Sequence, residues 1–287
     1  TAIGYADRFD EKYDHVRFMR KGKYTYWRNY QPFNFDGLHN FYRYKQEVFR
    51  EWRDLAKAGK LNPTQAAFFK ARDPEQLFDI EKDPHEVNNL AKDPAYENIL
   101  VEMRRAMKTK VRELPDVSFL PETALSGCDG NVVKLLKSNK QQIAKLATIA
   151  DLQLTPYPEA KAQINLALNA EDPMERYWGL ITCSAFGKNA DSFYSKAKDM
   201  AKNDPNRLVR TRAVEFLGLT GADDPLPLMM KVLEGCKDPI ELNLILNTAV
   251  LLRDGHGMKL THDMVKKADW SKVKGLVERR LEYLTKE

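Results

Sequence analysis

The chain has 287 residues, 43% of them hydrophobic and 30% charged, which is enough for two domains that each bury a core. It contains no apolar run of about eighteen residues, so the composition excludes a membrane-spanning helix. The net charge of +5 comes entirely from residues 1 to 60, where 13 basic residues outnumber 8 acidic ones.

Aromatic residues from Tyr5 to Trp52 are interleaved with this basic excess. Such a pattern can bind nucleic acid or an anionic sugar through ring stacking and charge. It also arises when a small sheet buries its aromatic residues and turns Lys and Arg towards water. An excess of five charges is too small for a dedicated nucleic-acid surface, so we expect no nucleic-acid partner.

The first predicted elements are a β-hairpin and a long helix. His15–Arg20 and Tyr24–Tyr30 alternate apolar with polar residues on either side of a turn at Gly22. A loop with Pro and Gly covers residues 31–40. Phe41–Ala58 then carries apolar residues at helical spacing and ends at a glycine.

The next predicted elements complete a small α+β unit over residues 1–120, with its helices packed on one face of an antiparallel sheet. Asn62-Pro63 begins a short helix, and the strand Leu77–Ile80 joins the hairpin. Asp83 is expected to cap a helix, with Pro84 in its first turn and Glu86 completing a capping box. Asp93-Pro94 then opens a helix that ends near Leu114-Pro115.

After residue 120 the strand signals stop and a repeat begins. Four similar blocks start at Lys145, Gly179, Ala213 and Asn247, each 34 residues after the one before. A fixed period of paired helices predicts an all-α solenoid over residues 121–287. Val209–Gly218 is similar to the second helix of a HEAT-type repeat.

Helix start and stop signals accompany the repeat. Gly ends three of the four blocks, as expected where a helix stops. The expected helix starts are three Asp-Pro pairs, and two of them are followed by a capping-box Glu, at Glu175 and Glu241. The pairs are Asp172-Pro173, Asp204-Pro205 and Asp238-Pro239.

The stretch around the strand at 77–80 resembles the signature L-Y-D-L-x-x-D-P-x-E-x-x-N-L-A, which lies near the C-terminal end of sulfatases. The matching residues are Leu77–Ile80, Asp83–Glu86 and Asn89–Ala91. His15–Tyr30 and Glu51–Leu61 are similar to the sulfamidase-like branch of that family, which includes heparan N-sulfatase. The resemblance covers roughly residues 5 to 122 and includes no catalytic motif. Some bacterial sulfatases carry helical repeats after the sulfatase core, which fits the second half only by analogy.

The family's nucleophile is a formylglycine made from a Cys/Ser-x-Pro-x-Arg motif, and no such motif occurs in the chain. The resemblance implies that the formylglycine, the calcium ligands and the sulfate-holding Lys and His lie in an N-terminal domain before Thr1. We therefore expect no catalytic residue, no metal site and no cofactor within these 287 residues.

Three residues are candidate substrate contacts. Ala6–Glu11 matches the loop by which family members return from the catalytic domain, and it contains Arg8 and Asp10. An Arg fork suits a sulfate or carboxylate, and an Asp suits sugar hydroxyls. Arg17, on the first hairpin strand, could reach the same region. The alternative is an Arg–Asp network that fixes the domain junction; we favour that structural role for Arg17 and the pocket role for Arg8.

The cysteines and most histidines give no catalytic or metal-ligand signal. Cys128, Cys183 and Cys236 lack metal-ligand spacing, and we interpret them as small buried hydrophobic residues. His85 is expected to be exposed or to support a neighbour by hydrogen bonding. His256 and His262 are expected on the surface, since their spacing of six lacks a third ligand.

Two functions remain open. The chain is either the non-catalytic C-terminal portion of a sulfatase acting on sulfate esters or sulfamates of a glycan, or a solenoid module that binds a protein or polysaccharide. The partners implied are its own N-terminal sulfatase domain, a sulfated glycan and a possible protein on the solenoid. A bacterial sulfatase of this kind would be periplasmic or secreted.

Overall fold

The structure, a computed structural model, describes residues 1–287 except 115, 127–130, 261–274 and 286–287. Four strands form one antiparallel sheet in the order β1-β2-β3-β4, and they are β1 (Ala2–Phe9), β2 (Lys12–Lys21), β3 (Tyr24–Asn29) and β4 (Glu75–Asp79). The predicted hairpin and the strand beside it are confirmed, with Gly22 at φ +59° in the tight turn. Strand β1 was not predicted, since Ala6–Glu11 was expected to be a loop.

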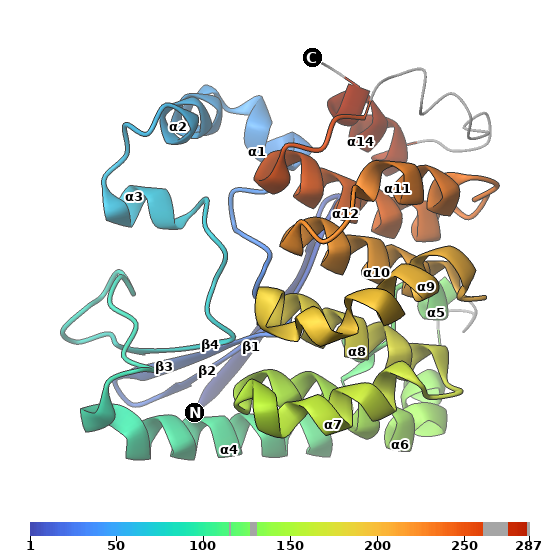
Figure 1. The fold of residues 1–287 in the computed structure, drawn as a ribbon. Coiled ribbons are helices and arrows are strands. Elements are labelled where there is room, and N and C mark those ends of the chain that lie inside the picture. The colour runs from blue at the N-terminus through green and yellow to red at the C-terminus, as the bar shows by residue number, and fades with distance from the viewer. Residues whose placement is uncertain (115, 127–130, 261–274, 286–287) are drawn as a thin grey trace.

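The helices of the N-terminal part lie around the sheet. They are α1 (Phe41–Lys45), α2 (Glu47–Lys57), α3 (Pro63–Ala67), η1 (Pro94–Tyr96), α4 (Glu97–Glu113), η2 (Val117–Phe119) and α5 (Thr123–Ser126). In Figure 1, α4 runs along the sheet, while α1, α2 and α3 lie on the side away from α4. The single helix predicted over 41–58 is wrong, because Gln46 has extended backbone (φ −80°, ψ 131°) and separates α1 from α2. Asn62 forms a capping box with Gln65, as its position before Pro63 suggested.

The helix start predicted at Asp83 is wrong, because the segment 80–92 is a turn and contains no helix. Asp83 instead closes this turn by accepting a hydrogen bond from the Asn88 amide at 2.7 Å. Glu86 does not form the predicted capping box: it has a positive φ of 52°, and its carboxylate accepts a hydrogen bond from Trp27 Nε1 at 3.0 Å. Asp93 caps the start of the next helix as predicted.

Strand register decides which residues face α4. Met19, Tyr26 and Leu77 are cross-strand neighbours and lie buried on one face, against Met103 and Met107 of α4. The residues directly before and after these three on each strand point to the opposite face of the sheet. No described helix runs across that face as α4 runs across the first (Figure 1). The sheet therefore has one buried face and one face open for a site.

Residues beyond 130 form helices that stack side by side from α6 to α14 (Figure 1). Contacts run in series from α6 to α8, α10, α12 and α14, while α7, α9 and α11 lie along this row. The elements are α6 (Val132–Asp151), η3 (Leu152–Leu154), α7 (Tyr157–Leu168), α8 (Pro173–Phe186), η4 (Gly187–Phe193), α9 (Tyr194–Asn203), α10 (Arg207–Thr220), α11 (Pro225–Leu233), α12 (Pro239–His256) and α14 (Leu276–Thr285).

Two of the three predicted Asp caps are confirmed, at Asp172 and Asp238. The third prediction is wrong: α10 is capped by Asn206, and Asp204 instead accepts a hydrogen bond from Arg176 Nε at 2.7 Å. The two predicted capping boxes are replaced by ion pairs, Glu175 with Lys145 at 2.6 Å and Glu241 with Arg207 at 3.3 Å. These carboxylates connect successive helices rather than closing their own helix starts.

Glycine ends α8 and α10 as expected, at Gly187 and Gly221, but α12 continues through Gly255 and stops at Gly257. Gly257 has φ +71°, a left-handed conformation that suits glycine.

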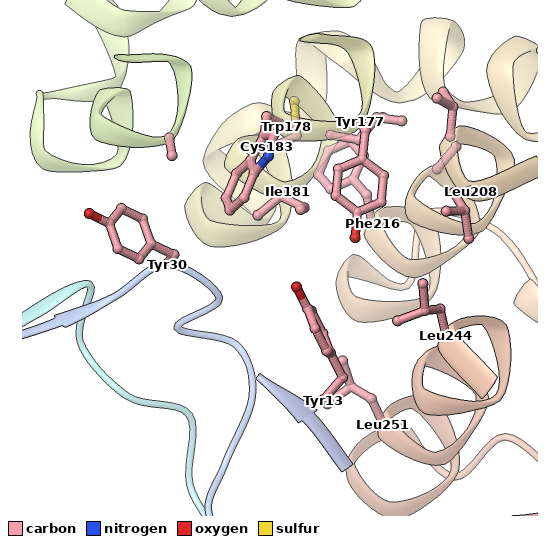
Figure 2. Close-up of a cluster of buried hydrophobic side chains, with 14 of the residues drawn as sticks. Tyr13, Tyr30, Tyr177, Trp178, Ile181, Cys183, Leu208, Phe216, Leu244 and Leu251 are labelled. Atoms are coloured by element: carbon pink, nitrogen blue, oxygen red, sulfur yellow. The ribbon is translucent and has the colours of Figure 1, made fainter. Parts of the chain in front are cut away.

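The apolar core continues from the sheet into the helices. In Figure 2, Tyr13 and Tyr30 of the N-terminal part lie beside the helical residues Tyr177, Trp178 and Phe216. Trp178 Nε1 donates a hydrogen bond to the Phe119 carbonyl at 2.8 Å. Arg28 of β3, only 1% exposed, donates to the Ala150 carbonyl at 2.8 Å. The two halves expected on either side of residue 120 thus share one continuous core.

Cys183 and Cys236 are buried free thiols, as predicted, and Cys128 lies outside the described residues. Burial raises the pKa of Cys236 to about 12, so its thiol is protonated at neutral pH. No described helix combines the length and apolar character needed to cross a bilayer.

Candidate functional site

A groove of about 830 Å³ lies over the open face of the sheet. All four strands contribute to its lining, and the loops around Asp36, Arg72 and His85 form its rim. His85 is exposed there, as predicted. The groove exists because the strand register sends Val16, Trp27 and their neighbours away from α4.

Aromatic rings cover part of this open face. Phe18 and Trp27 are cross-strand partners whose rings stack with centroids 4.9 Å apart. Gly4 lies opposite Phe18, and a Cβ at this position would come within 2.0 Å of the Phe18 ring. The Trp27 indole is held by its hydrogen bond to Glu86. A half-exposed indole beside a carboxylate acceptor is a surface on which a sugar ring can stack.

An ionic cluster borders the other end of the groove. Arg72 Nη2 donates to both carboxylate oxygens of Asp14, at 2.9 and 2.8 Å, and Lys12 Nζ lies 3.7 Å from the same carboxylate. Asp36 lies 3.5 Å from Arg72 and 4.0 Å from Lys12. Burial by itself would raise the pKa of Asp14, but Arg72 and Lys12 outweigh it and hold the pKa below its ordinary value. Burial lowers the pKa of Lys12, an effect that Asp14 and Asp36 oppose.

Arg8 lies in the groove, on edge strand β1 and not on a loop as predicted. Its side chain is 33% exposed and forms an ion pair with Glu122 at 2.9 Å. Its Nε donates to the Asp10 carbonyl at 2.7 Å. Arg8 is therefore partly engaged by the protein while still facing the groove.

Arg17 is enclosed by two carboxylates. Its guanidinium donates to Asp7 at 2.5 and 3.1 Å and to Asp116 at 2.6 and 2.8 Å, with only 7% of its side chain exposed. Burial would raise the pKa of Asp116, but the nearby His15 ring and the hydrogen-bonded Arg17 guanidinium hold that pKa well below its ordinary value. The arrangement has the geometry of the internal Arg–Asp network considered as the structural alternative.

Asp10 forms the turn between β1 and β2, where it has a positive φ of 55°. Its carboxylate lies 3.5 Å from Arg279 of α14, and its Oδ2 is buried without a hydrogen-bond partner among the described residues. Asp10 does not line the groove with Arg8. The structure thus brings Arg8 to the open face, Arg17 to a buried network, and Asp10 to a contact with the last helix.

Sequence reasoning missed the groove residues Trp27, Glu86 and Arg72 as possible ligand contacts. The sequence pattern placed Trp27 in a hairpin and Glu86 in a capping box, and predicted no ligand contact for either. Their meeting depends on the positive φ at Glu86, for which the sequence carries no signal. Arg72 had no local signal, because Asp14 lies 58 positions earlier in the chain.

The charges of the groove lining are balanced. The lining contains four Arg or Lys and four Asp or Glu, of which Lys12 and Arg72 pair with Asp14 and Asp36. Among the residues that the structure describes, no three His, Cys, Asp or Glu side chains gather as metal ligands would. His256 is exposed, as predicted, and His262 lies outside the described residues.

One characterised protein is similar to part of this chain: an ulvan-active sulfatase from Formosa agariphila, 39% identical over 121 residues. The match covers 42% of this chain and 20% of that protein, so the chain spans about a fifth of the relative's length. No protein-family model matches the sequence. No solved structure matches it either. The chain therefore contains a sulfatase-related region, together with the small antiparallel sheet and helices described above.

Proposed function

We propose that this chain is the C-terminal, non-catalytic portion of a sulfatase that acts on a sulfate-bearing glycan. The observation that carries the proposal is the 39% identity over 121 residues to a sulfatase. The sequence adds the Leu77–Ala91 signature and contains no Cys/Ser-x-Pro-x-Arg motif. Within this proposal the chain supplies one wall of the substrate pocket and supports the catalytic domain.

The groove is the part of this chain that would contact substrate. Trp27, whose ring stacks on Phe18, offers a surface to a sugar, and Arg8 offers a cation at the edge strand. Arg17 would hold β2 to the segment at Asp116 and keep the groove in shape. Formylglycine and calcium belong, in this proposal, to an N-terminal catalytic domain, since the sequence contains no Cys/Ser-x-Pro-x-Arg motif.

The proposed substrate is described by its class and by the atom that carries the sulfate. The relative's name says that it acts on ulvan, which favours a sulfated polysaccharide as the class of substrate. The segments His15–Tyr30 and Glu51–Leu61 favour the sulfamidase-like branch, in which sulfate leaves nitrogen. A whole protein of this kind, if bacterial, would work in the periplasm or outside the cell.

A second function is favoured by the stacked helices beyond residue 130. We propose that they are HEAT-like repeats of an α-solenoid, with successive cap residues Asp172, Asn206 and Asp238. A groove of about 880 Å³ between α7 and the η4–α9 segment, lined in part by Lys161 and Lys196, offers a place for a protein or polysaccharide. The two functions are compatible in one polypeptide.

The first test is the coding sequence upstream of Thr1. We expect a Cys/Ser-x-Pro-x-Arg motif and the paired Asp residues of a calcium site there. An unrelated start codon at that place would refute the sulfatase proposal.

The second test compares the complete polypeptide with residues 1–287 alone. The complete protein should release sulfate from ulvan or a related glycan, and the chain alone should hydrolyse an aryl sulfate no faster than buffer. Turnover by the chain alone that survives chelation and repeated purification would contradict its non-catalytic role.

A further inference from the structure

A second cavity, of about 360 Å³, lies between the helices α1 and α2 and the last helices α12 and α14. In Figure 1 these helices meet at the end of the molecule opposite α4. The cavity differs from the groove on the sheet in its charge: five Arg or Lys line it, and Glu282 is the acidic residue among them. The basic residues are Arg50, Arg53, Lys57, Arg253 and Arg279.

A stack of three rings holds the two sides of the cavity together. His39 stacks on Tyr283 of α14 with ring centroids 3.5 Å apart, and on Tyr44 of α1 at 5.1 Å. The Arg53 guanidinium lies over the Tyr44 ring at 4.5 Å, and the Arg253 guanidinium lies over the Tyr283 ring at 4.7 Å. Ring stacking therefore fixes two guanidinium planes at the cavity, and the Arg253 guanidinium also donates a hydrogen bond to the Tyr283 carbonyl.

The hydrogen bonds of Arg53 and Arg50 within the described part of the chain use only part of their donor capacity. Arg53 Nε is buried without a partner among the described residues, and Arg53 Nη1 reaches the Tyr283 hydroxyl only at 3.4 Å. Arg50 donates to the backbone carbonyls of Tyr44 and Lys45, so no carboxylate in these bonds neutralises it. Buried donors of this kind are costly unless something accepts from them.

The field at the cavity is positive. Burial lowers the pKa of His39 to about 3, and the charges of Arg280, Arg53 and Arg253 lower it further in the same direction. The nearby Asp254 is already engaged, since it accepts from the Tyr283 hydroxyl at 2.7 Å and from the His39 amide at 3.4 Å. A neutral imidazole surrounded by guanidinium groups adds no positive charge, so the cavity can accept an anion without a prior protonation step.

We propose that this cavity binds an oxyanion, the sulfate ester of an acidic polysaccharide, at a place separate from the groove on the sheet. Guanidinium forks match the geometry of sulfate oxygens, and the Phe41 ring lines the cavity beside them. The oxyanion site rests on the cation cluster alone; the choice of a polysaccharide rests on the proposed function. The cavity would thus hold the polysaccharide away from the catalytic site, within the same polypeptide.

The test measures binding by the chain 1–287 with isothermal titration calorimetry. The probes are sodium sulfate, dextran sulfate and neutral dextran, all at constant ionic strength. We expect dextran sulfate to bind, sulfate to bind more weakly, and dextran not to bind. Equal binding of dextran and dextran sulfate, or tighter binding of single-stranded DNA than of dextran sulfate, would overturn the proposal.

Two pairs of variants locate the site. Arg53→Gln/Lys57→Gln should weaken dextran sulfate binding about tenfold or more, because charge-assisted hydrogen bonds are lost. The second variant, Arg50→Gln/Lys57→Gln, changes two exposed side chains. It replaces the first variant in the binding experiment if the first has a lowered melting temperature. The control Arg105→Gln/Lys140→Gln removes the same charge from exposed positions on α4 and α6, and should bind like the unmodified chain.

Equal affinity of the cavity variants and the control would show that sulfate does not bind in this cavity. The result is independent of sulfatase activity: a complete protein without turnover would refute the proposed function and leave binding by this chain unchanged. Conversely, an active complete protein whose chain 1–287 ignores dextran sulfate would refute the cavity alone.

Discussion

Arg17 and Arg8 have the same side chain and lie nine residues apart on neighbouring strands, but their surroundings are very different. Arg17 is held by Asp7 and Asp116 with 7% of its side chain exposed, while Arg8 is 33% exposed and pairs with Glu122. Removing one member of a buried pair leaves the other charge uncompensated, whereas an exposed pair contributes little. The burial of each residue, and not its type, decides the effect of substitution.

We predict that Arg17→Ala lowers the free energy of unfolding by about 3–5 kcal/mol. Arg8→Ala should lower it by less than about 1 kcal/mol. Urea denaturation followed by circular dichroism measures both. Arg17→Lys is the matched control: it keeps the charge but loses the fork that contacts both carboxylates, so its loss should be intermediate. A stability loss for Arg17→Ala no larger than that for Arg8→Ala would contradict the network.

In the complete enzyme, Arg8→Ala should reduce turnover of the natural anionic glycan more than turnover of a small aryl sulfate. The reason is that an aryl sulfate would need only the sulfate subsite of the catalytic domain. Arg17→Ala should reduce both together, with a lower melting temperature, because β2 and Asp116 lose their connection. Equal losses on both substrates for Arg8→Ala, with a lowered melting point, would assign Arg8 a structural role as well.

Glu11 gives a pH dependence of opposite sign to that of ordinary carboxylates. It is fully buried, and desolvation together with the neighbouring Asp10 carboxyl raises its pKa from 4.5 to about 7. The folded state then binds more protons than the unfolded state between these values, so stability is present below pH 4.5 and declines as pH rises towards about 7. The slope for one proton reaches about 1.4 kcal/mol per pH unit.

We predict that Glu11→Gln removes this decline, because the amide resembles the protonated acid. Denaturant midpoints at pH 5 to 8 would measure it, and an unchanged slope in the variant would exclude Glu11 as its cause. Asp14 and Asp116, whose pKa values are lowered, contribute a separate loss of stability only below about pH 4.

At the scale of elements, α10 occupies the middle of the helical row. It contacts α8 on one side and α12 on the other, with α9 and α11 beside it. Arg212 and Glu215 form a buried ion pair on α10, and they bond Tyr177 of α8 at 2.7 Å and Thr248 of α12 at 2.9 Å. These hydrogen bonds and the ion pair link α8, α10 and α12. A substitution that destabilises α10 should therefore also destabilise its neighbours.

We predict that Leu217→Ala on α10 costs about 2–5 kcal/mol through the cavity it leaves, since Leu217 is fully buried. Leu166→Ala on α7, where the side chain is 62% exposed, should cost less than about 0.5 kcal/mol and serves as the control. Thermal unfolding of the two variants compares them directly. An unchanged melting curve for Leu217→Ala would contradict the position assigned to α10 in the row.

At the scale of the whole molecule, the sheet and the helical row share their core and several polar contacts. Asn247 of α12 donates to the Glu11 carbonyl at 2.8 Å and accepts from the Tyr13 amide at 3.0 Å. Arg280 of α14, 1% exposed, donates to the His39 carbonyl at 2.7 Å. The beginning of the chain is therefore packed against its end.

We predict that residues 1–287 unfold in a single calorimetric transition, and that a fragment of residues 1–120 fails to fold. The fragment would expose Phe119, Tyr30 and Tyr13, which the helices cover in the intact chain. Scanning calorimetry of the chain and amide NMR spectra of the fragment test the two statements. Two separate transitions, or a dispersed spectrum from the fragment, would instead establish two independent domains at the 120/121 boundary.

The sequence by itself determined the local elements and the resemblance to sulfatases. The hairpin, the strand at β4, the cap at Asp93 and most helices beyond residue 130 follow from short-range patterns of apolar residues, Gly and Asp-Pro pairs. The sulfatase-related region was also visible in the sequence, because the signature around Leu77–Ala91 is contiguous.

Only the tertiary structure decided where the candidate sites lie. Strand β1 forms because β2 offers it backbone partners, and its own residues carry no clear alternation. Trp27 meets Glu86, Arg72 meets Asp14, and Arg53 meets Tyr283 across separations of 59, 58 and 230 residues. Side-chain contacts over such distances depend on how helices and strands pack, and local sequence patterns hold no record of that packing.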